Sequence, residues 1–126
     1  MFPLYIIYDT WAVLLLRVAL GIVFIAHGWP KLKDLKQTAK NFDAMGFKPG
    51  KLFGTIAALL EFFGGIALIL GILVTPVAAL FMLQFIIIMI WKWAKHMPLV
   101  GGWEIDLLIL AGVFVLFTLG AGALAL

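Results

Sequence analysis

The stretch TWAVLLLRVALGIVFIAHG, residues 10–28, decides the fold class of this chain. It is about as long as a helix that crosses a bilayer once, which needs about 20 apolar residues. Only Arg17 and His27 interrupt its apolar character. No basic segment precedes the stretch and no small-residue cleavage site follows it, so it predicts a membrane span and not a removable signal peptide.

Three further apolar runs follow along the chain. We expect the four spans near residues 10–28, 51–74, 76–92 and 103–122. None of the runs alternates between apolar and polar residues, as the strands of a membrane barrel do. The sequence therefore predicts an all-α membrane protein, a four-transmembrane-helix bundle that forms a single transmembrane domain over residues 1–126.

The composition supports a membrane protein. The 126 residues are 66% hydrophobic and 12% charged, whereas a soluble domain is about half apolar and about a quarter charged. The surface of a water-soluble globule cannot be covered with so few polar groups, so we expect a lipid bilayer around the chain. The sequence contains no cysteine, which excludes disulfides, thiol catalysis and iron–sulfur ligation. The net charge of +3 requires no nucleic-acid partner.

The first connection predicts an amphipathic helix lying in the membrane interface over residues 31–45. Its apolar residues recur at steps of three and four, the helical spacing, and its lysines fall elsewhere on the helix. The apolar positions are Leu32, Leu35, Ala39, Phe42 and Met45. Gly46 is suited to end this helix. A solvated basic loop is the alternative interpretation.

The lysines predict the orientation in the membrane. Six of them lie within residues 31–51, and Lys92 and Lys95 lie between the third and fourth spans. The N-terminal segment, the second connection and the C-terminus contain none. Because basic loops stay in the cytoplasm, we expect both lysine-rich loops inside and both termini outside.

Three polar residues lie deep within the predicted spans. Counted from the lysine-bearing edge at helical rise, Arg17, Glu61 and Gln84 lie about 16, 14 and 12 Å deep. An arginine at such a depth usually faces the protein interior and has a partner. We therefore predict a buried ion pair between Arg17 and Glu61, with Gln84 as a neighbour. The pair either fixes the register of two helices or lines a ligand or proton site.

A second polar cluster lies nearer the lysine-bearing edge. Its members are His27, Lys31, Lys95, His96, Glu104 and Asp106. Residues two apart on a helix face different sides, so only one of Glu104 and Asp106 can point inward. The cluster is either a polar rim at the interface or a place where protons exchange and a polar ligand is oriented.

The two histidines leave metal-centred alternatives open. His27 and His96 are suitable ligands for a haem held inside a four-helix bundle. Together with Glu104 they also offer ligand types that zinc accepts. Neither alternative has a tight spacing motif, so we assign no metal ligand.

Several motifs follow one another along nearly the whole chain. They are Arg17-x-x-x-Gly21, His27-Gly28-x-x-Lys31, Glu61-x-x-Gly64-Gly65, Gly101-Gly102-Trp103-Glu104 and Gly120-x-Gly122. In this order and at these spacings the chain resembles the DoxX family of small four-helix membrane proteins, related to the small DoxD subunit of thiosulfate:quinone oxidoreductase. The resemblance implies a multipass protein of a bacterial or archaeal cytoplasmic membrane. It also favours Glu104 as the inward carboxylate, which leaves Asp106 either to snorkel toward the interface or to pair with a lysine.

The resemblance also implies a function. We expect an integral membrane subunit or accessory protein of a quinone-linked redox system. It would bind a quinone-like amphiphile near Arg17, Glu61, His27 and Glu104, and would work with a soluble oxidoreductase subunit or as a homo-oligomer. No intrinsic cofactor and no catalytic residue are assigned, so the redox chemistry would come from a bound quinone or a partner subunit. The alternative is a non-enzymatic carrier, channel-like protein or assembly factor that uses the Arg17 and Glu61 layer.

Overall fold

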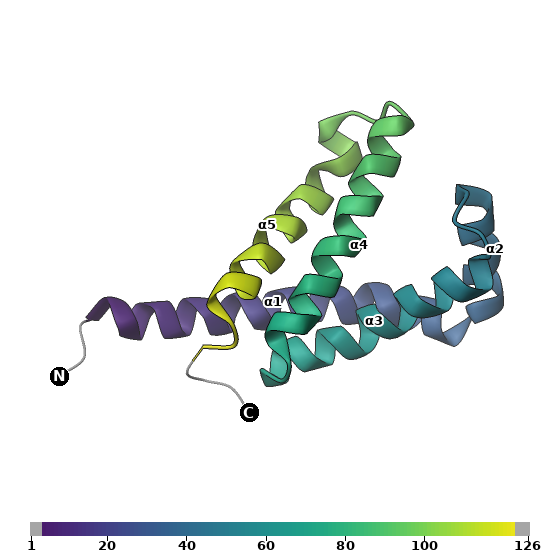
Figure 1. Cartoon of the computed structure of the whole chain (residues 1–126). Helices are drawn as coiled ribbons and strands as arrows, with labels where there is room; N and C mark the ends of the chain where they lie inside the picture. The colour runs from purple at the N-terminus through teal and green to yellow at the C-terminus, as the bar shows by residue number, and fades with distance from the viewer. Residues whose placement is uncertain (1–3, 123–126) are drawn as a thin grey trace.

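A computed structural model describes residues 4–122, with side chains from residue 10 onward. Its helices are α1 (Leu4–Lys33), α2 (Leu35–Met45), α3 (Gly50–Leu70), α4 (Val74–Ala94) and α5 (Glu104–Leu119), and a kinked turn, η1 (Leu99–Trp103), precedes α5 (Figure 1). The described part contains no strand, and four of its helices are long and apolar enough to cross a membrane. The predicted all-helical membrane fold is therefore confirmed.

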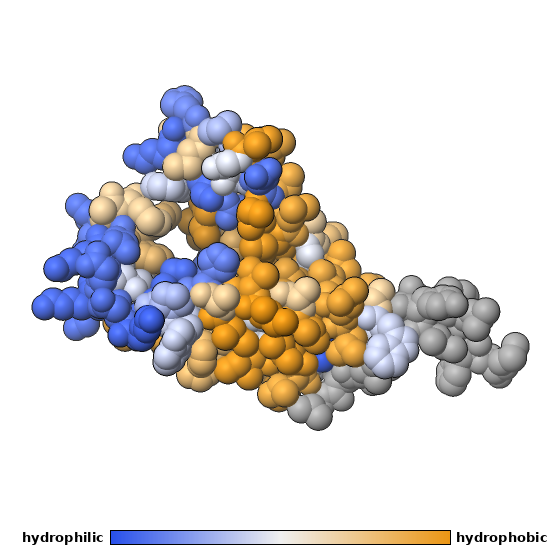
Figure 2. Space-filling view, turned by 180° about the vertical axis from the view of Figure 1, so that it is seen from behind, coloured by the Kyte–Doolittle hydropathy of each residue, from blue (hydrophilic) through white to orange (hydrophobic). Residues whose placement is uncertain are grey.

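The helices associate as two pairs. α1 packs along α3 and α4 packs along α5, whereas contacts between the pairs are fewer. Figure 1 shows α4 and α5 diverging from α1 and α3, with α2 lying across the far end of the α1–α3 pair. Seen from behind, hydrophilic residues gather on one side of the molecule in two lobes separated by an opening (Figure 2). Apolar residues cover the adjoining surface in this view.

Glycines allow α1 and α3 to approach closely. A Cβ on Gly21 would lie 2.6 Å from the carbonyl oxygen of Gly65, and a Cβ on Gly65 would lie 2.7 Å from the carbonyl oxygen of Gly21. A Cβ on Gly28 would lie 2.5 Å from the backbone nitrogen of Phe62. Small residues at such contacts let helices associate in lipid, where the hydrophobic effect offers little drive.

A buried aromatic stack joins α4 to the first pair. The ring of Phe24 on α1 stacks on Phe81 of α4, with ring centroids 3.7 Å apart and planes 3° from parallel. Gly64 of α3 makes room for Phe81, because a Cβ there would lie 2.8 Å from the ring. Phe85 packs against Phe24 at a tilt. Three helices therefore meet at these residues.

The lysine-bearing ends of the two pairs are also connected. The indole nitrogen of Trp91, near the end of α4, donates a hydrogen bond of 2.8 Å to the carbonyl of Met45 at the end of α2. The Phe47 ring lies 6.4 Å from the Trp91 ring. The loop after α2 therefore bridges the otherwise diverging pairs.

The first connection differs in detail from the prediction. α1 does not end at Gly28 but continues through Pro30 to Lys33. The separate helix begins at Leu35, where the Asp34 side chain accepts a hydrogen bond from the backbone N–H of Gln37, and it ends at Gly46 as expected. Most of the segment predicted as an interfacial helix is thus helical, but its first three residues belong to α1.

Candidate functional site

Glu61 is a buried carboxylate at which side chains from three helices meet. It lies on α3, and its Oε1 accepts a hydrogen bond of 2.9 Å from the Lys31 ammonium of α1. Its Oε2 accepts a hydrogen bond of 3.2 Å from the Gln84 amide of α4. The Glu61 side chain is 4% exposed and that of Lys31 is 28% exposed. The predicted proximity of Gln84 to Glu61 is confirmed.

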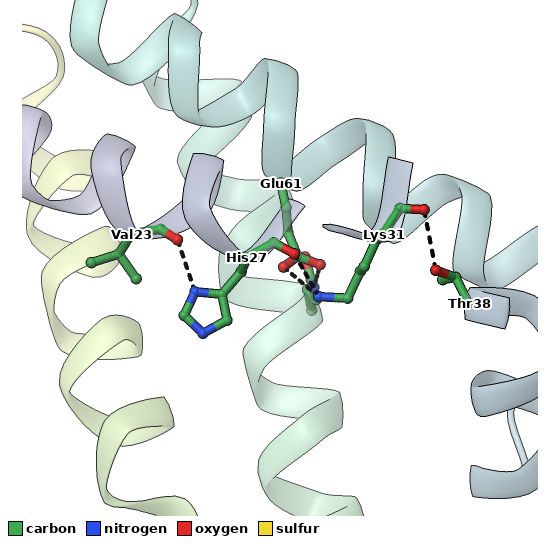
Figure 3. A network of polar contacts seen from close by, with 6 residues as sticks. Val23, His27, Lys31, Thr38 and Glu61 are labelled. Carbon is green, nitrogen blue, oxygen red and sulfur yellow. Dashed lines mark hydrogen bonds and ion pairs between the residues drawn. The ribbon is translucent and has the colours of Figure 1, made fainter. Parts of the chain in front are cut away.

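The position of Lys31 follows from helical spacing. His27 and Lys31 are four residues apart, so they share one face of α1. The Lys31 ammonium donates both to Glu61 and, at 3.3 Å, to the backbone carbonyl of His27 (Figure 3). The Lys31 carbonyl accepts a hydrogen bond from the Thr38 hydroxyl, which links this end of α1 to α2.

The orientation of the His27 ring defines its chemistry. Nδ1 lies 2.8 Å from the Val23 carbonyl oxygen. Because a carbonyl can only accept, Nδ1 carries the proton, and Nε2 is the acceptor of the neutral ring. The ring is exposed to the surroundings of α1 and points away from the Lys31 ammonium (Figure 3). His27 therefore contacts the ion pair through its backbone carbonyl, and its ring presents Nε2 to the surroundings of α1.

One polar atom of the site has no partner. Gln84 Oε1 is buried and accepts no hydrogen bond within residues 10–122. A buried acceptor without a donor is costly, by about 1–3 kcal/mol. We refer to Lys31, Glu61 and Gln84, together with His27, as the Glu61 network. It contains a carboxylate, an ammonium, an imidazole and this unsatisfied carbonyl.

The predicted Arg17–Glu61 ion pair is wrong. Arg17 is fully buried, and its guanidinium donates to the backbone carbonyls of Leu68 at 2.9 Å, Ile69 at 3.0 Å and Ala121 at 2.8 Å. The side chains that bind Glu61 are Lys31 and Gln84. Arg17 thus ties the last turn of α3 to the chain that follows α5.

The error comes from the length of α1. The predicted depth of Arg17 assumes that the first span ends at Gly28. In the structure Gly28 packs beside Glu61 and Phe62, so Gly28 and Glu61 lie at the same level. Arg17 precedes Gly28 by 11 residues, which corresponds to about 16 Å along a helix. That distance places Arg17 beside Leu68 instead of Glu61.

A second ion pair connects α4 and α5. The Lys92 ammonium binds the buried Asp106 carboxylate and also donates to the Gly102 carbonyl. The pairing of Asp106 with a lysine is confirmed, but the inward role expected for Glu104 is wrong. Glu104 is half-buried at the start of α5, where it accepts a hydrogen bond from the Gly101 N–H.

The sequence did contain a signal for Asp106. On α5, the buried residues Ile109, Val113 and Leu116 follow Asp106 at steps of three and four. A helix buries residues at this spacing on one face, and extending the pattern backwards reaches Asp106 and not Glu104.

His96 is not brought to the Glu61 network. It lies exposed after the end of α4, and within residues 10–122 it makes no hydrogen bond or ion pair with the network. No group of three or more histidine, aspartate or glutamate side chains in this part of the chain is placed to hold a metal ion. The zinc alternative through His27, His96 and Glu104 is therefore wrong, whereas the two-histidine haem stays untested.

Comparison with known proteins identifies the family. The family model for DoxX matches residues 12–95, which include every member of the Glu61 network. The chain belongs to the DoxX family. Asp106 and Glu104 lie outside the matched residues, whereas Arg17 lies within them together with the whole network.

Two relatives are similar to this DoxX protein over much of its length. "Putative oxidoreductase CatD" of Bacillus subtilis (strain 168) is 35% identical over 113 residues, which cover 90% of this chain and 82% of the relative. "Inner membrane protein YqjF" of Escherichia coli (strain K12) is 40% identical over 73 residues, which cover 58% of this chain and 54% of the relative. No solved structure matches the chain significantly. The chain is thus a multipass membrane protein of the DoxX family.

Proposed function

We propose that this DoxX protein is a membrane subunit or accessory protein of a quinone-linked redox system. In this proposal it binds the polar head of a quinone beside the Glu61 network. The observation that carries the proposal is a hydrogen-bonding site within the spans, built by three helices around Glu61. Intramembrane ionisable groups are unfavourable in lipid and commonly mark ligand or proton sites.

The chemistry of the donors and acceptors fits a quinone. The Lys31 ammonium has three N–H groups, of which two serve Glu61 and the His27 carbonyl, and the third suits a ligand carbonyl. The Nε2 atom of His27 and the unsatisfied Gln84 Oε1 are acceptors that suit a hydroxyl. A quinone head carries carbonyls when oxidised and hydroxyls when reduced, so a site with both donors and acceptors suits both forms.

In this proposal the chain binds the quinone, orients it and exchanges protons with it. A bound quinone supplies the transfer of electrons, which this cysteine-free chain does not supply from its own side chains. Lys31, partly exposed, holds its ammonium between the surroundings and the buried Glu61 carboxylate.

The oxidoreductase part of the proposal has separate support. The relative CatD is described as an oxidoreductase and covers most of this chain. Electron transfer to or from the quinone then requires a partner, and we propose a soluble oxidoreductase subunit for that role. The chain itself serves as the quinone-binding, non-catalytic component.

Quinone binding can be tested with two matched histidine variants. The purified full-length chain is titrated with decylubiquinone in detergent, and binding is followed by quenching of tryptophan fluorescence. We expect saturable binding that falls at least tenfold in His27→Asn and Glu61→Gln. His96→Asn serves as the control, because His96 is equally exposed but lies outside the network. Partition equal to that of empty micelles, or an equal loss in His96→Asn, contradicts the proposal.

A further inference from the structure

A cluster of lysines on the first connection has no ionic partner. Lys33, Lys36 and Lys40 are exposed and form no ion pair with any residue that the structure describes. We refer to these three residues as the α2 basic patch. Lys33 is the last residue of α1, and Lys36 and Lys40 lie on α2. Exposed positive charge at the junction of two helices is an electrostatic site for an anion.

The nearby carboxylates are already used by the backbone. Asp34 accepts a hydrogen bond of 3.1 Å from the N–H of Gln37, and Asp43 accepts one of 2.7 Å from the N–H of Gly50. Both aspartates thus fix the ends of structural elements, and neither forms an ion pair with a lysine that the structure describes. Three lysines against two aspartates leave residues 33–43 with a net charge of +1.

A hollow adjoins the patch. It has a volume of about 320 Å³, lies where α1 meets α2, and is lined by Lys31, Lys33, Gln37 and Asn41, with the Asp34 carboxylate also at its edge. Of the patch, Lys33 lines the hollow, and Lys36 and Lys40 do not. The Gln37 amide donates to the Asn41 side-chain oxygen at 2.9 Å, so the Lys33 ammonium and the remaining amide N–H groups are the donors that suit phosphate oxygens.

Exposed apolar side chains stand beside these charges. Trp29, near the end of α1, is 52% exposed, and Leu35, at the start of α2, is 40% exposed. The spanning part of α1 ends at Lys33, so the patch lies at the level where the chain leaves the bilayer. A lipid offers an anionic head and an apolar chain at this level, whereas an acidic soluble protein offers only the charge.

We propose that the α2 basic patch binds the anionic head group of a membrane phospholipid. The lysines contact the phosphate, and Trp29 and Leu35 contact the start of the acyl chains. Lys31 of the Glu61 network also lines the hollow, but none of the three patch lysines belongs to that network, so variants of the patch test this proposal separately from quinone binding. Basic residues on an interfacial helix bind anionic lipids in this way.

Native mass spectrometry of the full-length chain tests the proposal. The protein is equilibrated with equal amounts of phosphatidylglycerol and phosphatidylcholine, and the retained lipid is counted. We expect a preference for phosphatidylglycerol that falls by up to about fivefold for each lysine changed to glutamine, which corresponds to about 1 kcal/mol per lysine. The triple variant Lys33→Gln, Lys36→Gln, Lys40→Gln should show no preference.

A charge-conserving variant provides the control. The triple arginine variant at the same three positions keeps the charge and should keep the preference. Because all three side chains are exposed, folding of both variants can be verified by circular dichroism. No preference in the unaltered protein, or an unchanged preference in the glutamine variant, overturns the proposal. The second outcome would favour an acidic protein surface as the partner of the patch.

Discussion

Arg17 and Lys31 lie about four turns apart on α1 and have different kinds of partner. Lys31 neutralises a carboxylate near the lysine-bearing end. Arg17 instead satisfies backbone carbonyls at the far end of α3, where the last carbonyls of a helix have no partner within the helix. A guanidinium is suited to this task because its five N–H groups point in fixed, separate directions.

Removing the guanidinium should unfold the far end of the bundle. In Arg17→Ala, three carbonyls lose a charged donor, but that of Leu68 keeps a hydrogen bond of 3.3 Å from the Gly71 N–H. Each of the other two costs about 1–3 kcal/mol if it stays buried, so we expect a loss of at least about 2 kcal/mol in the free energy of unfolding, measured by denaturation in mixed micelles. Arg17→Lys should be intermediate, because an ammonium cannot reach all three carbonyls. Unaltered stability in Arg17→Ala would contradict this role.

Removing the carboxylate should have a smaller effect. In Glu61→Ala, Lys31 loses its ion-pair partner, but its partly exposed side chain can turn toward water. We expect a loss of about 2 kcal/mol, the scale of a hydrogen bond to a charged group, measured in the same assay. The double variant Lys31→Met, Glu61→Leu should recover part of this loss, because it leaves no unpaired charge. A double variant with a lower free energy of unfolding than Glu61→Ala would contradict this expectation.

Among the helices, the contact between α1 and α3 sets the geometry of the site. The backbones touch at Gly21 and Gly65, so the two helices have little freedom to slide along each other. Their fixed offset places Gly28 beside Glu61 and brings Lys31, one turn further along α1, within reach of the carboxylate. The ion pair is thus a consequence of how closely two helices pack.

Two alanine substitutions test this contact. In Gly65→Ala the new Cβ would lie 2.7 Å from a backbone oxygen of α1, which cannot move aside alone. We expect a loss of about 1–3 kcal/mol from overpacking, measured by denaturant titration followed by circular dichroism. Gly112→Ala is the matched control, because its Cβ would meet flexible methyl groups of Leu20 and Leu16 at 3.2 and 3.4 Å. Equal losses in both variants would argue against a close α1–α3 contact.

At the scale of the whole molecule, hydrophilic residues gather at one side, and apolar residues cover the adjoining surface in Figure 2. The two connections that carry lysines both lie on this side, and the connection between α3 and α4 contains none. The positive-inside rule therefore predicts that the lysine-bearing side faces the cytoplasm.

Single cysteines can test the orientation, since the chain has no cysteine of its own. Ala44 on α2 and Ile72 in the loop between α3 and α4 are both exposed. In intact cells, a membrane-impermeant maleimide should label Ile72→Cys, and should label Ala44→Cys only after the membrane is permeabilised. The reverse labelling pattern would place the lysine-rich side outside.

The sequence by itself determined that the chain is a membrane protein of four helical spans. Composition and the length of the apolar runs are sufficient for this, because lipid requires each crossing to satisfy its own backbone hydrogen bonds. Residue depth also brought Gln84 near Glu61, as the structure has them.

Only the tertiary structure decided which cation binds Glu61 and which carboxylate of α5 points inward. Periodicity tells which face of a helix is buried, but not how far one helix is displaced along its neighbour. That displacement depends on α1 continuing through Pro30 and on the close contact at Gly21 and Gly65. When one helix is displaced by a few residues along its neighbour, its side chains meet different partners. For this reason Glu61 binds Lys31 and not the predicted Arg17.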